Sequence, residues 1–152
     1  MNLIDLLLGE HAVLRTTLDH YEKALPSWTL SQMKEAGRLL ESLLMTHGIL
    51  EDELLFDILP VQQEGVRTTL QAMREEHQQQ RRLLEGLRGE VTIVGARRAL
   101  RELCEQVEEH FSIEERVLFG VAAETLGEDR LGALAREWTR RRGLCCAAKA
   151  RV

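Results

Sequence analysis

The chain has 152 residues, the size of one domain that can bury a substantial hydrophobic core. It carries 25 acidic residues against 20 lysines and arginines, and a net charge of −5 argues against nucleic-acid binding through a basic face. Aromatic residues make up only 4% of the chain, and leucine dominates the apolar residues, which favours helices over strands. The sequence has neither a membrane-length apolar run nor the basic start of a signal peptide, so we expect a cytoplasmic protein without membrane contact.

Four long segments carry apolar residues at three- and four-residue steps, the period of an amphipathic helix. In chain order these segments run over residues 4–18, 33–58, 66–87 and 100–121. The residues that break the pattern also mark where helices end or begin. Pro26 ends the first segment, and Thr29 or Ser31 can cap the second. Pro60 ends the second segment. The third and fourth segments are separated by Gly86, Gly89 and Thr92.

A shorter amphipathic stretch follows Gly127 and runs from Asp129 to Arg142. Its basic end, residues 140–142, is interpreted as complementing a helix dipole. Short connections between long helices predict an all-α fold: an up-down-up-down antiparallel four-helix bundle with a short fifth C-terminal helix. Residues 1–142 are predicted to form the domain, and residues 143–152 a C-terminal tail.

Two stretches of the chain share the pattern H-x-x-x-E-acid-x-x-L-F, one beginning at His47 and the other at His110. Each is preceded by an element that reads E-H-x-x-x-R-x-x-L-acid, which contains His11 in the first copy and His77 in the second. The chain therefore repeats the order His, His-x-x-x-Glu. Such a repeat of metal-binding residue types predicts a buried site for two metal ions.

Helix geometry brings these side chains together, because residues four apart lie on one face. His47 then points with Glu51, and His110 with Glu114, and both pairs fall in the apolar stripe of their helix. Buried carboxylates are costly unless they are paired or bind a metal. Each of the four helices contributes one histidine and two add a glutamate, so the predicted metal ligands are His11, His47, Glu51, His77, His110 and Glu114.

Taken singly, these residues have ordinary interpretations. A histidine on an apolar face is usually a satisfied core residue, and His-x-x-x-Glu is a common helical ion pair. His20 is assigned to the surface by its phase relative to His11. The acidic neighbours of the predicted ligands are expected to face solvent: Glu10, Asp52, Glu53, Glu76 and Glu115. Arg15 and Arg81 either support the histidines or extend outward, and we favour the second interpretation.

The three cysteines form no Cys-x-x-Cys pair, which is typical of a reducing compartment. Cys104 falls in a helical pattern and is expected to be a small core residue. Cys145 and Cys146 lie in the predicted tail, where a redox role stays open.

The repeated motifs resemble the hemerythrin family in its bacterial His-His-Glu form, over about residues 3–125. The resemblance implies a non-haem centre of two iron ions, bridged by two carboxylates and an oxo or hydroxo group. Glu51 and Glu114 would bridge the metals. His11 and His47 would complete one metal, and His77 and His110 the other. Zinc or manganese is also compatible with these ligands.

The chain departs from the oxygen carriers of this family in its third helix. Those proteins have two histidines one turn apart there, whereas Met73 and Arg81 flank His77 in this chain. The site is therefore expected to hold four histidines, with room for solvent on the second metal. The Glu-x-x-His motif of ferritin-like proteins is absent.

Our main hypothesis for function is a di-iron protein that binds O2, NO or a related small ligand for carriage or sensing, or that handles iron. The first alternative is a di-iron enzyme or repair factor that acts on peroxide or on iron–sulfur centres under oxidative or nitrosative stress. Repair factors of the family carry an N-terminal cysteine-bearing segment, which is not expected here ahead of His11. The second alternative is a metal-free helical interaction module.

Overall fold

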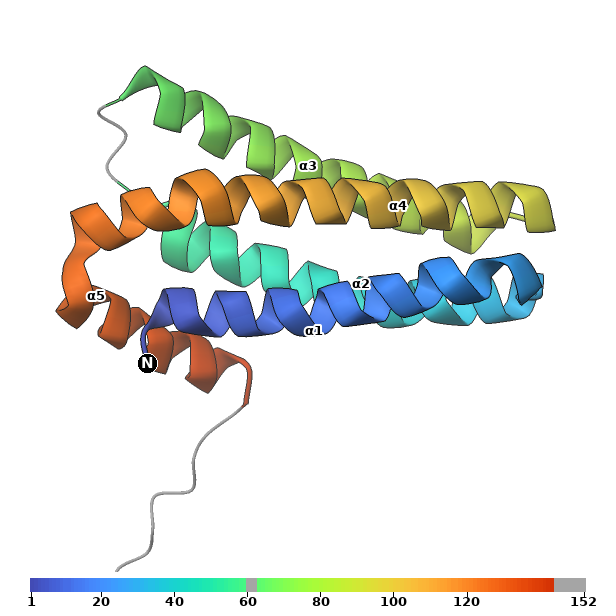
Figure 1. Cartoon of the computed structure of the whole chain (residues 1–152), viewed down its shortest axis with the longest axis horizontal. Coiled ribbons are helices and arrows are strands. Elements are labelled where there is room, and N and C mark those ends of the chain that lie inside the picture. The colour runs from blue at the N-terminus through green and yellow to red at the C-terminus, as the bar shows by residue number, and fades with distance from the viewer. Residues whose placement is uncertain (60–62, 144–152) are drawn as a thin grey trace, which may run out of the picture.

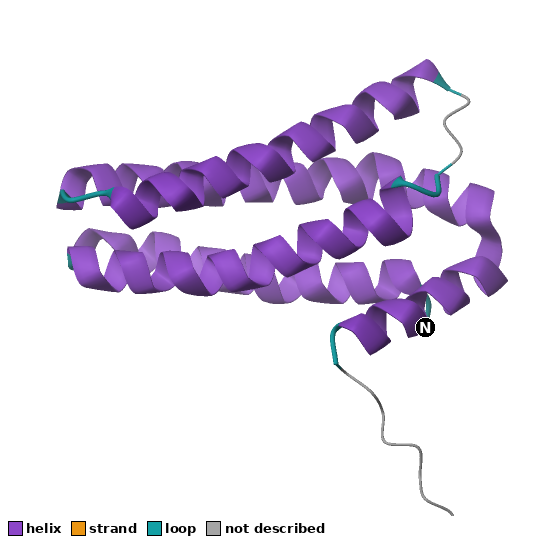
Figure 2. Cartoon of the chain, turned by 180° about the vertical axis from the view of Figure 1, so that it is seen from behind, coloured by secondary structure: helices purple, strands orange, loops and turns teal. Residues whose placement is uncertain are grey.

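The computed structural model describes residues 1–59 and 63–143, which contain helices and no strands (Figures 1 and 2). The long helices are α1 (Leu3–Ala24), α2 (Leu30–Glu51), α3 (Glu64–Gly89), α4 (Ile93–Ile113) and α5 (Phe119–Arg141). Three short elements complete the order: the 3-10 turn η1 (Leu25–Ser27) and the π-helical turns η2 (Asp52–Phe56) and η3 (Glu114–Leu118).

Helices α1 to α4 run in alternating directions and form the bundle (Figure 1). The prediction of an all-helical fold with four main helices is confirmed. The separate short helix expected from Asp129 is not found as its own element. Instead, one 23-residue helix, α5, carries this stretch beyond a kink at Gly127.

Local sequence explains where the helices begin. Asn2 caps α1 in a reciprocal capping box with Asp5. Thr29 caps α2 in the same way with Gln32, as one of the two predicted caps. Thr92 caps α4 through its hydroxyl, which accepts a hydrogen bond from the backbone N–H three residues later. Side chains thus satisfy backbone N–H groups that each first turn leaves free.

The ends of α2 and α3 differ in detail from the prediction. The helical part that starts with α2 ends at Phe56, after the π-helical turn, and Pro60 lies outside the described residues. Gly86 lies inside α3 and does not end it, because a single glycine weakens a helix without breaking it. Gly89 is the last residue of α3.

The kink in α5 turns the chain back along the bundle. Gly127 has φ 69° and ψ 166°, a backbone conformation that is accessible essentially to glycine alone. The residues after it pack against α1, so α5 covers the end of the bundle where the chain begins (Figure 1). Trp138, which is 1% exposed, joins the core there.

The hydrophobic core is divided into two clusters. One contains Leu3 and Leu7 of α1 and reaches into α5. The other contains Leu14 and Leu18 of the same helix and reaches the far end of the bundle. His11 lies between these leucines in α1, so a polar layer separates the two apolar clusters.

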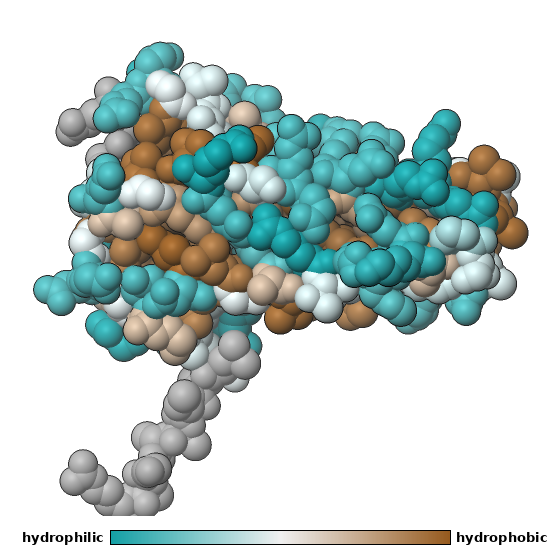
Figure 3. Space-filling model, in the orientation of Figure 1, coloured by the Kyte–Doolittle hydropathy of each residue, from teal (hydrophilic) through white to brown (hydrophobic). Residues whose placement is uncertain are grey.

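The surface is mainly hydrophilic in Figure 3, with apolar patches at both ends of the visible face. Where α3 connects to α4, three large apolar side chains are exposed: Val91, Ile93 and Val94. No helix within the described residues is long and apolar enough to cross a membrane.

We predict that Gly127→Ala lowers the free energy of unfolding by roughly 1–3 kcal/mol, because the conformation at this position is strained for any residue with a Cβ. The Cβ itself would meet open space, so the effect isolates the backbone conformation. Urea unfolding measures the change in the free energy of unfolding.

Gly120→Ala in the same helix is the matched control, because its Cβ also meets open space. In an α-helical conformation alanine should stabilise by about 0.5–1 kcal/mol. Equal effects of the two substitutions would contradict the account.

Candidate metal centre

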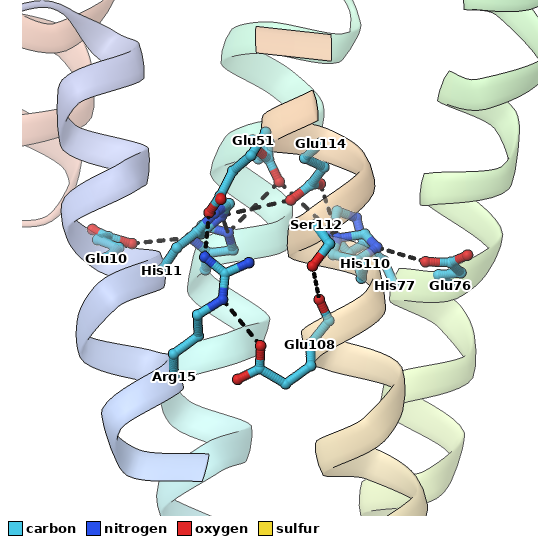
Figure 4. Close-up of polar contacts among 12 residues, drawn as sticks. Glu10, His11, Arg15, Glu51, Glu76, His77, Glu108, His110, Ser112 and Glu114 are labelled. Carbon is cyan, nitrogen blue, oxygen red and sulfur yellow. Dashed lines mark hydrogen bonds and ion pairs between the residues drawn. The ribbon is translucent and has the colours of Figure 1, made fainter. Parts of the chain in front are cut away.

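The structure brings all six predicted ligands together in the polar layer between the two core clusters. Figure 4 labels each of them except His47. They come from α1, α2, α3, α4 and the first residue of η3. Their exposed fractions are 0% to 1%, except for His77 at 9%. The six residues are His11, His47, Glu51, His77, His110 and Glu114.

These residues form two overlapping groups, each with four donor atoms within 4.8 Å of one another. Both groups contain Glu51 and Glu114. The first adds His11 and His47, and the second adds His77 and His110. Two ions held in these groups would therefore share both carboxylates.

Each carboxylate faces one histidine from each group. Glu51 Oε2 lies 3.6 Å from His47 Nε2 and 3.8 Å from His77 Nε2. Glu114 lies 3.5 Å from His11 Nε2 and 2.9 Å from His110 Nε2, through different oxygens. This is the arrangement that a bridging carboxylate requires.

The two carboxyl groups are not satisfied by hydrogen bonds within the described residues. All four of their oxygen atoms are buried without a hydrogen-bond partner. Burial, followed by repulsion from Glu114, raises the pKa of Glu51 well above its usual range. Burial likewise raises the pKa of Glu114 to about 8. A cation placed between these groups would remove this cost.

The four imidazoles meet in two pairs through their Nε2 atoms. The Nε2–Nε2 distance is 3.2 Å between His11 and His47, and 3.0 Å between His77 and His110. Burial and the neighbouring His47 lower the pKa of His11 to about 2, and burial also lowers the pKa of His47. Neutral imidazoles present the lone pairs that metal ions bind.

A carboxylate lies behind every one of these histidines, at the other ring nitrogen. His11 Nδ1 is 2.9 Å from Glu115, and His47 Nδ1 is 3.0 Å from Glu10. Such contacts fix the tautomer and orientation of a metal-binding imidazole. The corresponding distances in the other pair are 2.8 Å for His110 Nδ1 to Glu76 and 3.3 Å for His77 Nδ1 to Asp52.

The expectation that these four acidic residues face solvent is therefore wrong. Their side chains start at the edge of the buried face and reach a histidine on a neighbouring helix. Only Glu53 of the five is exposed as predicted, where it pairs with Arg141. The signal was present in the repeat itself. We call His11 and His77, which come first in each copy and have no glutamate four residues later, the lone histidines. Both copies carry an acidic residue just before the lone histidine and another just after the glutamate ligand.

Equivalent positions in the two copies of the repeat make equivalent contacts, so the two halves of the centre are arranged alike. The residue before the lone histidine binds the second histidine of its own copy, as Glu10 binds His47. The residue after the glutamate ligand binds the lone histidine of the opposite copy, as Glu115 binds His11. Each copy thus orients ligands in both halves of the centre.

The last residue of the repeated motif also acts across the copies. Phe119 stacks on His11 with a centroid distance of 5.6 Å, and Phe56 stacks on His77 at 6.0 Å. Each follows a glutamate ligand by five residues, across η2 or η3. A π-helical turn holds more residues than an α-helical turn, so it returns the fifth residue to the face of the glutamate.

Basic residues hold two of the supporting carboxylates. Arg15 donates to Glu115 at 2.6 Å and to Glu108 at 3.0 Å, so our expectation that it extends outward is wrong. Its counterpart Arg81 is exposed, as expected. Arg15 therefore supports one half of the centre only.

Helix α5 holds the supporting carboxylate of His47. Glu10 accepts hydrogen bonds from Trp138 Nε1 at 3.0 Å and from Arg142. Burial alone would raise the pKa of Glu10, but the contacts with His47 and Arg142 outweigh it and lower the pKa. Arg142 thus does more than complement a helix dipole.

Three other residues of interest within the described part of the chain are not among the six clustered residues. His20 is exposed, as expected. Met73 is a core residue and Cys104 is buried and free. Cys145 and Cys146 lie outside the described residues.

A comparison with known families identifies the domain. The family model described as the hemerythrin HHE cation binding domain matches residues 2–96, more than half of the chain. The chain belongs to the hemerythrin HHE cation-binding family. The matched range includes four of the six clustered residues. The other two, His110 and Glu114, lie beyond residue 96, in the second copy of the repeat. No curated protein and no solved structure matches the chain significantly.

The donor set of this hemerythrin domain fits a pair of cations. It combines imidazole nitrogens with carboxylate oxygens and contains no thiolate, a set that suits iron, zinc or manganese. The carboxylate oxygens without a hydrogen-bond partner are the atoms that two shared ions would bind.

We predict that Glu114→Gln raises the free energy of unfolding of the metal-free protein at pH 8 by about 1–3 kcal/mol, because it removes a buried carboxylate without a partner. The direction follows from the raised pKa of Glu114, since folding then disfavours the ionised form present in the unfolded chain. Denaturant unfolding in the presence of a chelator measures the change. Glu124→Gln, at an exposed position of α5, should have little effect. A metal-free Glu114→Gln protein less stable than the wild type would contradict this interpretation.

Proposed function

We propose that this domain is a non-haem di-iron protein that binds O2, NO or a related small ligand, for carriage or sensing, or in handling iron. The observation that carries the proposal is the pair of four-donor groups that share the unpartnered carboxylates Glu51 and Glu114. A structural ion pair would leave no such orphaned oxygens, because buried polar groups in folded proteins are normally hydrogen-bonded.

The number of donors supports binding of a further small ligand. Each group offers four residues, fewer than the six positions of an octahedral ion. Bound iron would supply reversible redox change and coordination positions that side chains do not fill. Zinc or manganese would fit the same donors, but zinc lacks the redox change that O2 binding requires.

The residues of the domain have three roles in this proposal. The six ligands hold the ions, and the carboxylates behind the histidines keep each Nε2 aimed at the centre. The two apolar clusters restrict water on either side of the polar layer. Limited water around a redox centre favours reversible ligand binding over side reactions.

An enzyme or repair factor that acts on peroxide or iron–sulfur centres is the second candidate. The coordination positions that would admit O2 would also admit peroxide. Steady-state consumption of peroxide by the iron-loaded protein would favour the enzyme, whereas a single stoichiometric oxidation would favour binding.

We predict that wild-type protein loaded with iron contains two ions per chain, and that Glu51→Ala loses both together because each ion depends on that carboxylate. Metal analysis after gel filtration gives the ratio. His20→Ala is the control, since this histidine is exposed and outside both groups. Fewer than one ion per wild-type chain would support the metal-free interaction module, and equal loss from His20→Ala would contradict the assignment of ligands.

We also predict that Glu76→Ala weakens metal affinity by roughly 10- to 100-fold, because His110 loses the carboxylate that orients it. Competition with a chelator of known affinity measures the change. The adjacent Glu75 is exposed and accepts a hydrogen bond from Gln71 in the same helix, so Glu75→Ala should leave the affinity unchanged. A similar loss in both variants would mean that net charge, and not orientation, determines the affinity.

A further inference from the structure

The two halves of the centre differ although the repeat relates them. Within residues 1–59 and 63–143, every buried side-chain atom without a hydrogen-bond partner belongs to five residues: Glu51, Asp52, His77, Gln80 and Glu114. Two of these are the shared carboxylates. The other three belong to the half around His77, and their counterparts around His11 have no such atoms.

The covering of the two lone histidines is the first difference. The residue after His110 is Phe111, whose ring stacks on His11 at 3.8 Å and 13°. The corresponding residue after His47 is Gly48, and a Cβ added there would lie only 3.2 Å from the ring of His77. His77 is 9% exposed and His11 is 0% exposed. Each histidine also has a phenylalanine stacked on it, Phe56 on His77 and Phe119 on His11. The difference is that His77 packs against the backbone at Gly48, whereas His11 packs against the additional ring of Phe111.

The third residue after each lone histidine is the second difference. It is Leu14 in the first copy and Gln80 in the second, and both are buried, at 3% and 2% exposure. Gln80 lies about one turn from His77 on the same buried face of α3. Its Nε2 has no hydrogen-bond partner. A buried amide donor thus stands in the second copy where the first copy has an apolar side chain.

The supporting carboxylate is the third difference. Asp52 replaces the longer Glu115, and its contact with His77 Nδ1 is 3.3 Å without hydrogen-bond alignment, against 2.9 Å for the counterpart. A small movement would align this pair, and bound metal would satisfy the shared carboxylates. Neither the alignment of Asp52 with His77 nor metal binding by the carboxylates gives Gln80 a hydrogen-bond partner. Its amide nitrogen is a donor, so it requires an acceptor atom.

We propose that a small exogenous ligand with hydrogen-bond acceptor atoms reaches the metal pair from the His77 half, and that the Gln80 amide donates a hydrogen bond to it. The inference rests on the proposed metal centre and adds the side of entry and the residue that selects the ligand. Small anions and bent diatomic ligands belong to this chemical class. In the His11 half, the ring of Phe111 stacks on the histidine, and the apolar Leu14 stands where the other half has Gln80.

Azide is a suitable probe, because it is a small anion whose binding to iron is followed by visible absorption. We expect the iron-loaded wild type to bind azide, and Gln80→Leu to weaken the affinity about tenfold or more with two irons still bound, since hydrogen bonds to charged groups are strong. Gln80→Met, which keeps the length of the side chain, should do the same and serves if the leucine variant folds poorly. Gln78→Leu, at an exposed position two residues earlier, should leave the affinity unchanged.

Two further measurements separate a ligand-binding role from a structural one. The thermal midpoint of metal-free Gln80→Leu should rise, because an unpartnered buried amide is removed. Gly48→Ala, whose Cβ presses on His77, should slow azide association while Gly9→Ala, with open space around its Cβ, should not.

Each outcome decides between the claims. A wild type that binds no iron overturns the proposed function and this inference together. Two bound irons with no azide binding, or with equal azide affinity in wild type and both Gln80 variants, overturn the inference alone. A lowered midpoint together with lost iron in both variants shows that Gln80 is structural, which also overturns its role as donor.

Discussion

Two carboxyl groups without hydrogen-bond partners, buried between two apolar clusters, determine the rest of this structure. Glu51 and Glu114 could not remain ionised there without a compensating positive charge, and burial raises the pKa of both. The imidazoles of His11 and His47 cannot supply that charge readily, because burial also lowers their pKa. Cations bound between the two carboxylates would bring the missing positive charge, so we expect the metal-free fold to be less stable than the metal-loaded fold.

A second layer of carboxylates keeps the imidazoles aimed at this centre. Each lies on a different helix from the histidine it orients, so the helices of the bundle are linked in pairs across the polar layer. Two of these carboxylates are held in turn by Arg15 and by Trp138 with Arg142 of α5. The kink at Gly127 turns the second part of α5 back along α1 (Figure 1). It is therefore connected with the metal centre, because this part of the helix carries Trp138 and Arg142, which donate hydrogen bonds to Glu10.

Helical periodicity was enough to predict the four main helices and the clustering of the six residues. A side chain that points to the centre of the bundle must lie on the same helix face as the apolar residues of the core. It failed for Asp52 and Glu115, which follow the glutamates at the start of or within π-helical turns, where a constant angle per residue no longer applies. It failed for Glu10 and Glu76 because a long side chain at the edge of one helix can reach the next. The contact between Glu10 and Arg142 spans 132 residues, which no local pattern encodes.

Diffraction from crystals of the iron-loaded protein, recorded on both sides of the iron absorption edge, tests the central claim most directly. The account predicts two anomalous peaks within bonding distance of the carboxylates of Glu51 and Glu114, one on the side of His11 and His47 and the other on the side of His77 and His110. A single peak, or iron bound only at surface carboxylates with the six side chains hydrogen-bonded among themselves, would contradict it.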